Sequence, residues 1–337
     1  MTQNSPLPIL VTGAAGFIGA RLVERLNSLG LPLISVDDLG AFQERAEHAT
    51  LQFGKQWSIE QLDEILDREA REKTPPQFSA IFHLGAISDT TELDTEKLRI
   101  RNVLASQKLW NSASRNGIPF YYASSAATYG EGENGYDDDE TRFSHLKPLN
   151  PYGESKRVFD LWVLSEEKQG NHPPSWAGFK FFNVYGFGER HKGKMASVVL
   201  HAFDQIHSRG FVKLFKSHRE GISDGEQKRD FIFVEDVIDV LLFAWKKPIR
   251  RGVFNLGTGN ARSFRELVES VFAALDRSPQ IEFVDTPLEL RERYQYFTQA
   301  EMARLRSEGY QTPFTPLEVG SAKTVNRLLQ HGKGTRS

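Results

Sequence analysis

The chain of 337 residues contains no cysteine. This absence excludes disulfide bonds, zinc sites built on thiolates and cysteine nucleophiles, and it is compatible with a reducing compartment. The chain also lacks a large net charge of either sign. It has 42 basic and 44 acidic residues, which give a net charge of -2. No overall positive field exists to hold nucleic acid or anionic lipid, so an anionic ligand must be bound by local donors.

Long hydrophobic runs are missing as well. The first eight residues are polar without a positively charged start, and the apolar run Ile9–Val11 is too short for a signal sequence or a membrane span. Hydrophobic residues at 39% and charged residues at 26% make an ordinary globular balance. We therefore expect a soluble, cytoplasmic protein that binds neither nucleic acid nor a membrane, and we predict no metal site.

Short apolar runs alternate with helical patterns through the first half of the chain. The predicted strands are 9–11, 33–36, 80–83 and 120–123, and the predicted helices are 17–29 and 97–116. Strands that alternate with helices indicate a parallel sheet covered on both faces, and right-handed crossovers make it doubly wound. The expected fold class is α/β.

The pattern loosens after about residue 175. Further strands are predicted at 179–183 and 253–256, a helix at 263–275, and a polar loop at 217–228. We expect this half to supply a smaller lobe over the carboxyl ends of the strands, where open α/β sheets bind ligands.

A glycine-rich turn joins the first predicted strand to the first predicted helix. Gly13 would permit a tight turn, Gly16 would let the backbone approach a pyrophosphate, and Gly19 would allow close packing of helix on strand. An incidental glycine turn is the alternative. The strand–turn–helix context and Asp37, about 20 positions further on, match a dinucleotide-binding unit instead.

Residues after the second predicted strand bear on the choice of cofactor. Asp37 and Asp38 could each accept hydrogen bonds from ribose hydroxyls, which favours NAD. A 2′-phosphate, as in NADP, would need a cation nearby, and Arg45 is a candidate whose plainer alternative is a solvated surface charge.

A tyrosine and a lysine four residues apart follow a proline that could start a helix. The spacing puts Tyr152 and Lys156 on one helix face. Tyrosine is a poor base at its usual pKa of about 10, and a neighbouring cation lowers that pKa by favouring the phenolate. Ser125, at the end of a predicted strand, could bond the substrate oxygen that loses its proton. Singly these residues have structural alternatives, as a packed aromatic, a surface charge and a helix cap; together they predict an active site.

Several segments resemble the extended short-chain dehydrogenase/reductase family, whose cofactor domain is of the Rossmann type. They are the glycine turn 11–19, Ser124–Gly130, Tyr152 with Lys156, and Phe182–Gly186. Within that family, further segments are similar to the nucleotide-heptose 6-epimerases, namely His191–Gly193, Met195–Val198, Lys228–Phe231, Phe254–Gly259 and Arg293–Gln299. The similarity runs in order over nearly the whole chain.

The resemblance implies an epimerase that inverts C6 of an ADP-heptose through transient oxidation to a ketone and return of hydride to the opposite face. It implies NADP, with NAD as the alternative, and a homo-oligomer that works in the synthesis of lipopolysaccharide or another surface glycan. Tyr152 corresponds to the first catalytic base, Lys192 to the second, Ser125 to the residue that orients the reacting oxygen, and Lys156 to the partner of Tyr152. Without the resemblance, Lys192 would be taken for an exposed loop charge.

The resemblance also implies domains and binding residues. Residues 1–175 form the dinucleotide-binding domain, completed by segments of about 176–200 and 230–260, and residues 176–337 form mainly the substrate-binding lobe. The implied cofactor residues are Gly13, Gly16, Phe17, Ile18, Gly19, Asp37, Asp38, Leu84, Gly85, Ala86, Ser88, Asn102, Tyr152, Lys156 and Val184. The implied substrate residues are Ser125, Asn183, Lys194, His201, Phe215, Lys216, Ser217, His218, Arg229 and Tyr294.

Physical reasoning supports some of these positions and leaves alternatives at others. The guanidinium of Arg229 could grip a diphosphate with paired hydrogen bonds, although an ion pair with Asp230 is the alternative. His201 could equally be structural. Lys194 stands where the family usually has a small hydroxyl residue, so Lys192 and Lys194 could divide the second role differently.

Other departures keep competing functions open. The stretch 221–227 is longer than usual beside the expected nucleotide site, and Asp38 replaces a more typical amide, which argues against NADP. Another nucleotide-sugar epimerase, dehydratase or reductase is the first alternative, although Ala126 and Ala127 stand where dehydratases place acidic residues. A non-catalytic nucleotide-binding regulator of the same fold is the second.

Overall fold

The computed structural model describes residues 6–73, 78–291 and 295–334. The chain forms two compact units between which it passes several times. The first unit comprises Met1–Thr128, Asp138–Lys180 and Ile238–Phe254, and the second comprises Tyr129–Asp137, Phe181–Val237 and Asn255–Ser337. The functional division at about residue 175 stays a prediction.

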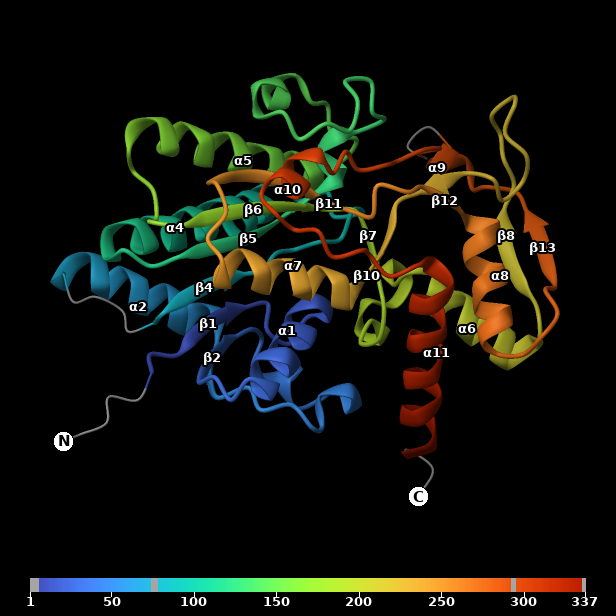
Figure 1. The fold of residues 1–337 in the computed structure, drawn as a ribbon, viewed down its shortest axis with the longest axis horizontal. Coiled ribbons are helices and arrows are strands. Elements are labelled where there is room, and N and C mark those ends of the chain that lie inside the picture. Colours follow the sequence, from blue (N-terminus) through green and yellow to red (C-terminus); the bar gives the residue numbers. More distant parts are fainter. Residues whose placement is uncertain (1–5, 74–77, 292–294, 335–337) are drawn as a thin grey trace. The chain divides into compact units, whose positions relative to one another are not determined.

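A seven-stranded sheet with the strand order β11-β6-β5-β4-β1-β2-β3 lies mainly in the first unit (Figure 1). Its strands are β1 (Ile9–Thr12), β2 (Leu33–Val36), β3 (Lys55–Trp57), β4 (Ala80–His83), β5 (Phe120–Ser125), β6 (Trp176–Phe181) and β11 (Gly252–Leu256). The pairings of β1 with β2 and β4, of β2 with β3 and of β4 with β5 are parallel. All residues of β1, β2 and β4 are buried, as expected of a parallel sheet covered on both faces.

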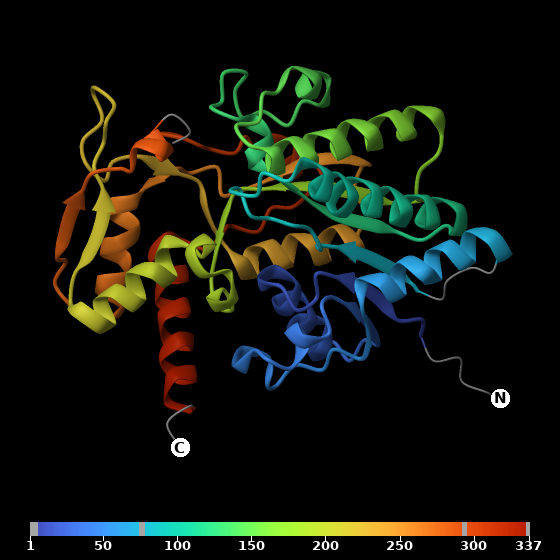
Figure 2. The ribbon, with the colours of Figure 1, turned by 180° about the vertical axis from the view of Figure 1, so that it is seen from behind.

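Helices cover both faces of this sheet, which confirms the doubly wound α/β prediction. On one face lie α1 (Phe17–Ser28) and α7 (Val234–Lys246), joined by a hydrogen bond of 2.7 Å from Arg25 to Asp239. On the other lie α2 (Ile59–Glu72), α4 (Ala105–Asn116) and α5 (Pro151–Gln169), in front of the sheet in Figure 2. None of the helices in the described ranges is long and apolar enough to cross a membrane.

The predicted helix 97–116 is a composite of three segments of two helical types. It begins as α3 (Thr95–Leu98), widens into a π-helix (Arg99–Leu104) and continues as α4. Such π-helical turns frequently occur at functional sites. The π-helical turn contains Asn102, one of the implied cofactor residues.

The second unit is built from short strand pairs and helices. Among its described residues, β7 (Asn183–Tyr185) pairs with β10 (Phe231–Phe233), β8 (Val212–Phe215) with β13 (Ile281–Val284), and β9 (Lys228–Arg229) with β12 (Arg262–Ser263). Its helices include α6 (Val198–Arg209), α8 (Phe264–Ala274), α9 (Leu288–Arg291), α10 (Ala303–Ser307) and α11 (Leu317–Gly334). Helix α8 packs against α6 and α11, and its predicted start at Ser263 is the capping residue, whose side chain accepts from the Glu266 N–H.

One predicted strand, 179–183, is wrong as a single element. The backbone changes partners at Phe182, whose N–H donates to the Leu256 carbonyl, while the Asn183 N–H donates to the Asp230 carbonyl. Strand β6 therefore ends at Phe181 and a new strand, β7, begins at Asn183. Hydrophobic side chains continue across the break, so the apolar pattern does not reveal it.

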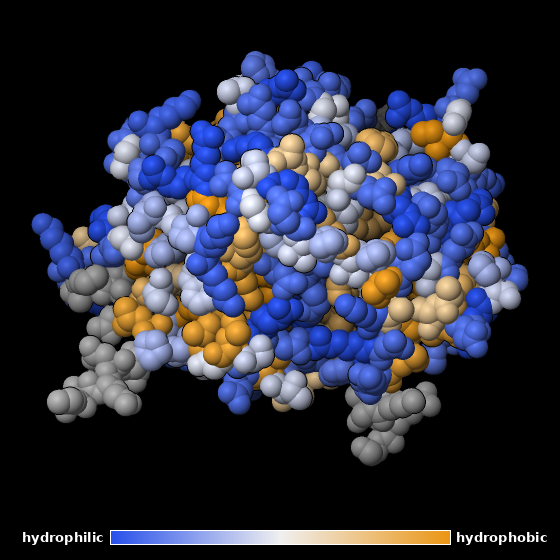
Figure 3. Space-filling model, viewed as in Figure 1, coloured by the Kyte–Doolittle hydropathy of each residue, from blue (hydrophilic) through white to orange (hydrophobic). Residues whose placement is uncertain are grey.

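Polar residues cover most of the surface seen in Figure 3, and hydrophobic residues are dispersed among them. This distribution is ordinary for a globular protein, because apolar atoms always contribute a large share of a folded surface.

Candidate active site

The glycine turn after β1 is sterically closed to side chains. Gly13 has a φ of +66°, and a Cβ built there would lie 2.6 Å from the backbone N of Gly85. A Cβ at Gly19 would lie 2.0 Å from the Gly13 carbonyl oxygen. Both positions therefore need glycine, for the turn and for the close packing of α1 on the turn.

The amino end of α1 is suited to an anion. Gly16 is the N-cap residue and makes no side-chain capping bond. The next residues, Phe17 and Ile18, lie in the first helical turn, where backbone N–H groups and the helix dipole favour negative charge. Binding of a pyrophosphate there remains a prediction.

The residues after β2 lie against the glycine turn. The Asp37 carboxylate accepts hydrogen bonds of 2.9 Å from the Ala15 N–H and from the Asp38 N–H. The Arg45 guanidinium donates to the Ala15 carbonyl, and its half-buried side chain has a pKa lowered by burial, against which the charge of Asp37 acts. Arg45 is thus packed against the turn and is not the solvated charge considered as its alternative.

The loop after β4 is fastened to the same turn. The Leu84 N–H donates to the Thr12 carbonyl and the Gly85 N–H to the Thr12 hydroxyl, each over 3.1 Å. Ala86 follows in a partly buried position, and Ser88 is exposed. The structure therefore brings the predicted cofactor residues of two strand ends together.

A buried hydrogen-bond chain runs beneath this loop. The Ser106 hydroxyl donates to the Asn102 carbonyl over 2.6 Å, so it accepts from Nε2 of His83 over 2.8 Å. A neutral His83 then accepts at Nδ1 from the Thr12 hydroxyl, 2.7 Å away. Burial, with a smaller contribution from the Lys156 charge, lowers the pKa of His83 to about 3. His83 is therefore a neutral structural link at physiological pH.

The Asn102 side chain is committed to protein groups. Its amide exchanges hydrogen bonds of 2.8 and 2.9 Å with the backbone of Ile87, and Nδ2 also lies 3.0 Å from the Ser155 hydroxyl. Ser155 in turn donates to the Tyr152 carbonyl over 2.7 Å. Asn102 thus ties the loop after β4 to the first turns of α5, and its direct contact with a cofactor stays a prediction.

Helix α5 begins where the sequence predicts, at Pro151. The Asn150 side chain caps it by accepting from the Gly153 N–H over 2.8 Å. A Cβ at Gly153 would lie 2.7 Å from the Ala127 carbonyl oxygen, so the helix start packs directly on the segment that follows Ser125. This close approach brings the tyrosine of α5 to the end of β5.

Tyr152 and Lys156 are both buried, with 9% and 5% of their surfaces exposed. Burial raises the pKa of Tyr152, and a hydrogen bond with Ser125 acts against that rise. Burial lowers the pKa of Lys156 to about 8, and the charge of Asp160 acts against that fall. The expectation that Lys156 lowers the pKa of Tyr152 is wrong for this structure, because burial raises that pKa and Tyr152 is a protonated phenol.

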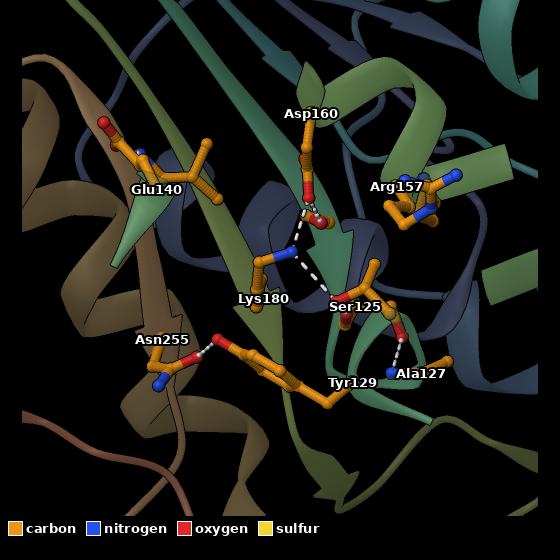
Figure 4. Close-up of polar contacts among 12 residues, drawn as sticks. Ser125, Ala127, Tyr129, Glu140, Arg157, Asp160, Lys180 and Asn255 are labelled. Atoms are coloured by element: carbon orange, nitrogen blue, oxygen red, sulfur yellow. Dashed lines mark hydrogen bonds and ion pairs between the residues drawn. The ribbon is translucent and has the colours of Figure 1, made fainter. Parts of the chain in front are cut away.

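Two buried residues beside this group are not predicted from the sequence. Lys180 on β6 and Asp160 on α5 form an ion pair of 2.6 Å, and neither side chain is exposed (Figure 4). Asp160 follows Tyr152 by two turns of the helix, and Lys180 interrupts an otherwise apolar strand. The helical spacing of Asp160 and the position of Lys180 in an apolar strand were the signals available in the sequence. They did not identify a buried pair, because a charged residue within a strand is also typical of the edge strand of a sheet.

In the second unit, a buried carboxylate holds the loop that carries Lys192. Glu189 is 1% exposed and accepts from the Ser197 N–H over 2.9 Å, the Ser197 hydroxyl over 2.6 Å and the Gly186 N–H over 3.2 Å. Nζ of Lys192 lies 3.4 Å from the same carboxylate. Lys192 is therefore an oriented, partly buried ammonium group.

Lys194 and His201 are linked to each other. Lys194 is exposed, and its carbonyl accepts a hydrogen bond of 3.3 Å from Nε2 of His201. This contact gives His201 a structural partner. Lys194 contributes its backbone carbonyl to it, whereas Lys192 approaches Glu189 with its side-chain nitrogen.

Arg229 is buried, with 6% of its surface exposed. Its guanidinium donates to the Lys228 carbonyl over 2.9 Å and to the Gln295 carbonyl. The Asp230 carboxylate accepts bonds of 2.7 and 2.6 Å from the N–H and hydroxyl of Thr258. Arg229 thus has a fixed position, and its contact with a diphosphate stays a prediction.

The other predicted substrate residues lie near the ends of strands in the second unit. Phe215 ends β8, and Lys216 pairs with Asp285 over 3.2 Å. The Ser217 N–H donates to Asp224 over 2.7 Å, and His218 accepts from the Thr286 N–H over 3.2 Å. Strand β7 carries Asn183 and Val184, and Tyr294 lies outside the described residues.

The predicted site residues therefore fall into two groups. The first unit holds the residues of the glycine turn, of the ends of β2 and β4, and Asn102, Ser125, Tyr152 and Lys156. The second unit holds Val184, Lys192 and the other described substrate residues. Within the described ranges, no three His, Asp or Glu side chains gather closely enough to hold a metal ion.

A closed glycine turn, an acidic residue after β2, and Ser125 at the end of β5 beside the buried Tyr152 and Lys156 of α5 are together typical of a nicotinamide-dependent enzyme. Residues 9–257 match the NAD dependent epimerase/dehydratase family, and the chain belongs to it.

Similar proteins narrow the class further. The ADP-L-glycero-D-manno-heptose-6-epimerase of Fusobacterium nucleatum is 41% identical over 332 residues, which cover 95% of this chain and 98% of the relative. The enzyme of the same name from Brachyspira hyodysenteriae is 36% identical over 96% of this chain and 98% of its own length. The crystal structure of the Helicobacter pylori ADP-L-glycero-D-manno-heptose-6-epimerase matches with a TM-score of 0.75 and 30% identity, covering 96% of this chain and 97% of that one. The resemblance to heptose epimerases is thereby confirmed.

Proposed function

We propose that this protein converts ADP-D-glycero-β-D-manno-heptose to ADP-L-glycero-β-D-manno-heptose by inverting C6 of the heptose. The observation that carries the proposal is the buried pair Tyr152 and Lys156 beside Ser125, in a chain similar over 95% of its length to a heptose epimerase. The hydrogen on an alcohol carbon is not acidic, so direct deprotonation is an unfavourable route. Transient oxidation to a ketone and reduction from the opposite face avoids it without net redox change.

The nicotinamide cofactor, when bound, supplies the acceptor and donor of hydride. Tyr152 takes the proton from the reacting hydroxyl as hydride leaves C6, and Ser125 orients the same oxygen. Lys156 binds the cofactor ribose and favours the phenolate with its positive charge. Because burial raises the pKa of Tyr152, the phenolate needs this cation and the positive ring of the oxidised cofactor.

Residues of the second unit serve the other face of the sugar and the nucleotide. Lys192, oriented by Glu189, acts as the second acid/base group. The diphosphate is held by the buried Arg229, the best suited to paired hydrogen bonds. The remaining contacts come from Asn183, Lys194, His201, Phe215, Lys216, Ser217, His218 and Tyr294.

The choice between NADP and NAD depends on Arg45. Family membership supports a nicotinamide dinucleotide, and the neighbour MoeE5, 25% identical, was solved with UDP-glucuronic acid and NAD. We propose NADP, because Arg45 is held against the glycine turn beside Asp37, where a 2′-phosphate would need a cation. Arg45→Met should weaken binding of NADP and leave binding of NAD unchanged. Equal effects on both, or NAD alone in the purified protein, would show that Asp37 selects NAD.

A substrate panel followed by NMR tests the reaction. The purified protein is incubated with the ADP-heptose deuterated at C6 and, separately, with UDP-hexoses. We expect inversion at C6 with the deuterium retained, because hydride leaves and returns without exchange. Conversion of a UDP-hexose but not the ADP-heptose would point to another sugar-nucleotide enzyme, and cofactor binding without any turnover would point to a regulator. Homo-oligomerisation and a cytoplasmic location are carried forward as predictions, tested by sedimentation and cell fractionation.

A further inference from the structure

The buried Asp160 carboxylate fastens α5 to β5. It accepts hydrogen bonds from the Ser124 hydroxyl over 2.7 Å and from the Tyr122 hydroxyl over 3.0 Å, two side chains on the same face of β5. Lys156, one turn earlier on α5, donates from Nζ to the carbonyl of Ala123 between them over 2.8 Å. Three consecutive residues of β5 are thus bound by α5, directly before Ser125. The relative position of Ser125 and Tyr152 depends on these bonds.

Lys180 is the ion-pair partner of this carboxylate. Its Nζ lies 2.6 Å from Asp160 (Figure 4). Nζ also lies 2.9 Å from the Thr128 hydroxyl and 4.2 Å from the centre of the Phe143 ring. A buried carboxylate without a cation would take up a proton. The Asp160 carboxylate of this pair lies one helical turn from Lys156, in surroundings that otherwise favour a neutral amine.

We propose that the Asp160–Lys180 ion pair is a positioning device that keeps Lys156 as an ammonium ion and fixes the register of α5 on β5 for Tyr152 and Ser125. This inference rests on the proposed function only in taking Tyr152 and Lys156 as the reacting pair. Neither Asp160 nor Lys180 contacts the reacting atoms; both act through Lys156 and the helix.

Other ionisable groups near Lys156 do not supply this charge. His83, from β4, is neutral and its pKa of about 3 keeps it so above pH 5. Tyr122, from β5, and Tyr152, on α5, both have pKa values raised by burial, so both are uncharged. Asp138 and Glu140 act on Lys180, where they raise its pKa against burial. Asp160 is therefore the anion that supports Lys156.

The test is a titration of Lys156 in the cofactor-loaded protein. Lysine labelled with 13C at Cε is followed by NMR from pH 6 to 11 in wild type and in Asp160→Asn, with the signal assigned by its loss in Lys156→Met. Asn keeps an acceptor for Ser124 but removes the charge. We expect the Lys156 midpoint to fall by about one pH unit or more, and the alkaline limb of the turnover profile to move down with it. Turnover lost at neutral pH should then recover partly on acidification, which a merely structural defect would not produce.

Controls separate charge from stability and from the proposed reaction. Should Asp160→Asn not fold, Asp160→Asn/Lys180→Met removes both charges and leaves no unpaired buried ion. Glu69→Gln removes another buried carboxylate, paired with Arg115 over 2.8 Å, and should leave the Lys156 titration unchanged. An unshifted Lys156 midpoint in a folded Asp160 variant overturns the inference. A shifted midpoint in a protein that does not epimerise the ADP-heptose leaves the inference standing and rejects only the proposed substrate.

Discussion

Lys156 donates a hydrogen bond of 2.8 Å from Nζ to the backbone carbonyl of Ala123, inside the first unit and with only 5% of the lysine surface exposed. A carbonyl stabilises an ammonium ion but does not neutralise it, and burial lowers the pKa of Lys156 to about 8. Folding therefore has a cost at this position wherever the lysine is charged.

That cost predicts a pH dependence of stability. Between pH 8 and 10.5 the unfolded chain holds a proton on Lys156 that the folded protein has released, so the free energy of unfolding rises with pH over this window. The full rise from this group is about 3 kcal/mol, at 1.36 kcal/mol per pKa unit. Urea unfolding in this window should show the rise in wild type and a flatter curve in Lys156→Met. Parallel curves would contradict the shifted pKa.

The buried His83 predicts that the free energy of unfolding falls at acidic pH. Its pKa is lowered to about 3, so between pH 6.5 and 3 the unfolded chain binds a proton that the folded protein excludes, and stability falls as the pH falls. The loss amounts to about 5 kcal/mol by the same conversion. His83→Gln should be less stable at pH 7 but lose less stability on acidification. His207→Gln, at an exposed position on α6, should follow the wild-type slope, and an equal slope in both variants would be evidence against a buried neutral His83.

Removal of the Tyr152 hydroxyl should impair chemistry more than binding. Tyr152→Phe is expected to lower turnover by roughly 10² or more, the usual scale for loss of a positioned acid/base group, while cofactor remains bound. Turnover and the cofactor content of the purified variant are the measurements. Tyr121→Phe is the matched control, because that buried hydroxyl bonds Ser175 and Ala244 instead. Full activity of Tyr152→Phe would remove it from the mechanism.

The Glu189 carboxylate should affect turnover through its contact with Lys192. Glu189→Gln is expected to lower turnover roughly tenfold, because bonds to charged groups contribute about 1.5–3 kcal/mol. In a Lys192→Met background the same change should have little further effect, since coupled residues are not additive. Asp204→Asn, which breaks the exposed pair with Arg190 beside the same loop, serves as control. An equal loss in both backgrounds would make Glu189 structural only.

The fold was predictable where hydrophobic runs were separated by strong turn signals. The predicted strands 33–36 and 80–83 have the observed bounds, because each is a fully buried run that ends at a polar residue or a turn. Strand β3 and helix α2 were not predicted. The residues of β3 are mostly exposed, and α2 is largely polar with few buried positions, so neither has a long apolar pattern.

The residues of the candidate site also divide into those that could be predicted from the sequence and those that could not. Gly13, Gly19, Tyr152 and Lys156 could be predicted because each lies in a short motif whose spacing has a local physical reason. Asp160 and Lys180 could not be paired, because they come from a helix and a strand twenty residues apart in sequence that only the packing of α5 on the sheet brings together. Glu189 likewise gains its role from four donors that the folded loop collects around it.

By itself the sequence determined the alternation of buried strands with helices in the first half of the chain, the glycine turn, and the tyrosine and lysine on one helix face, since local sterics and periodicity decide such features. Only the tertiary structure decided which groups are buried and what they contact. Burial sets the charge state of Tyr152, Lys156 and His83, because desolvation disfavours every ion that lacks a partner.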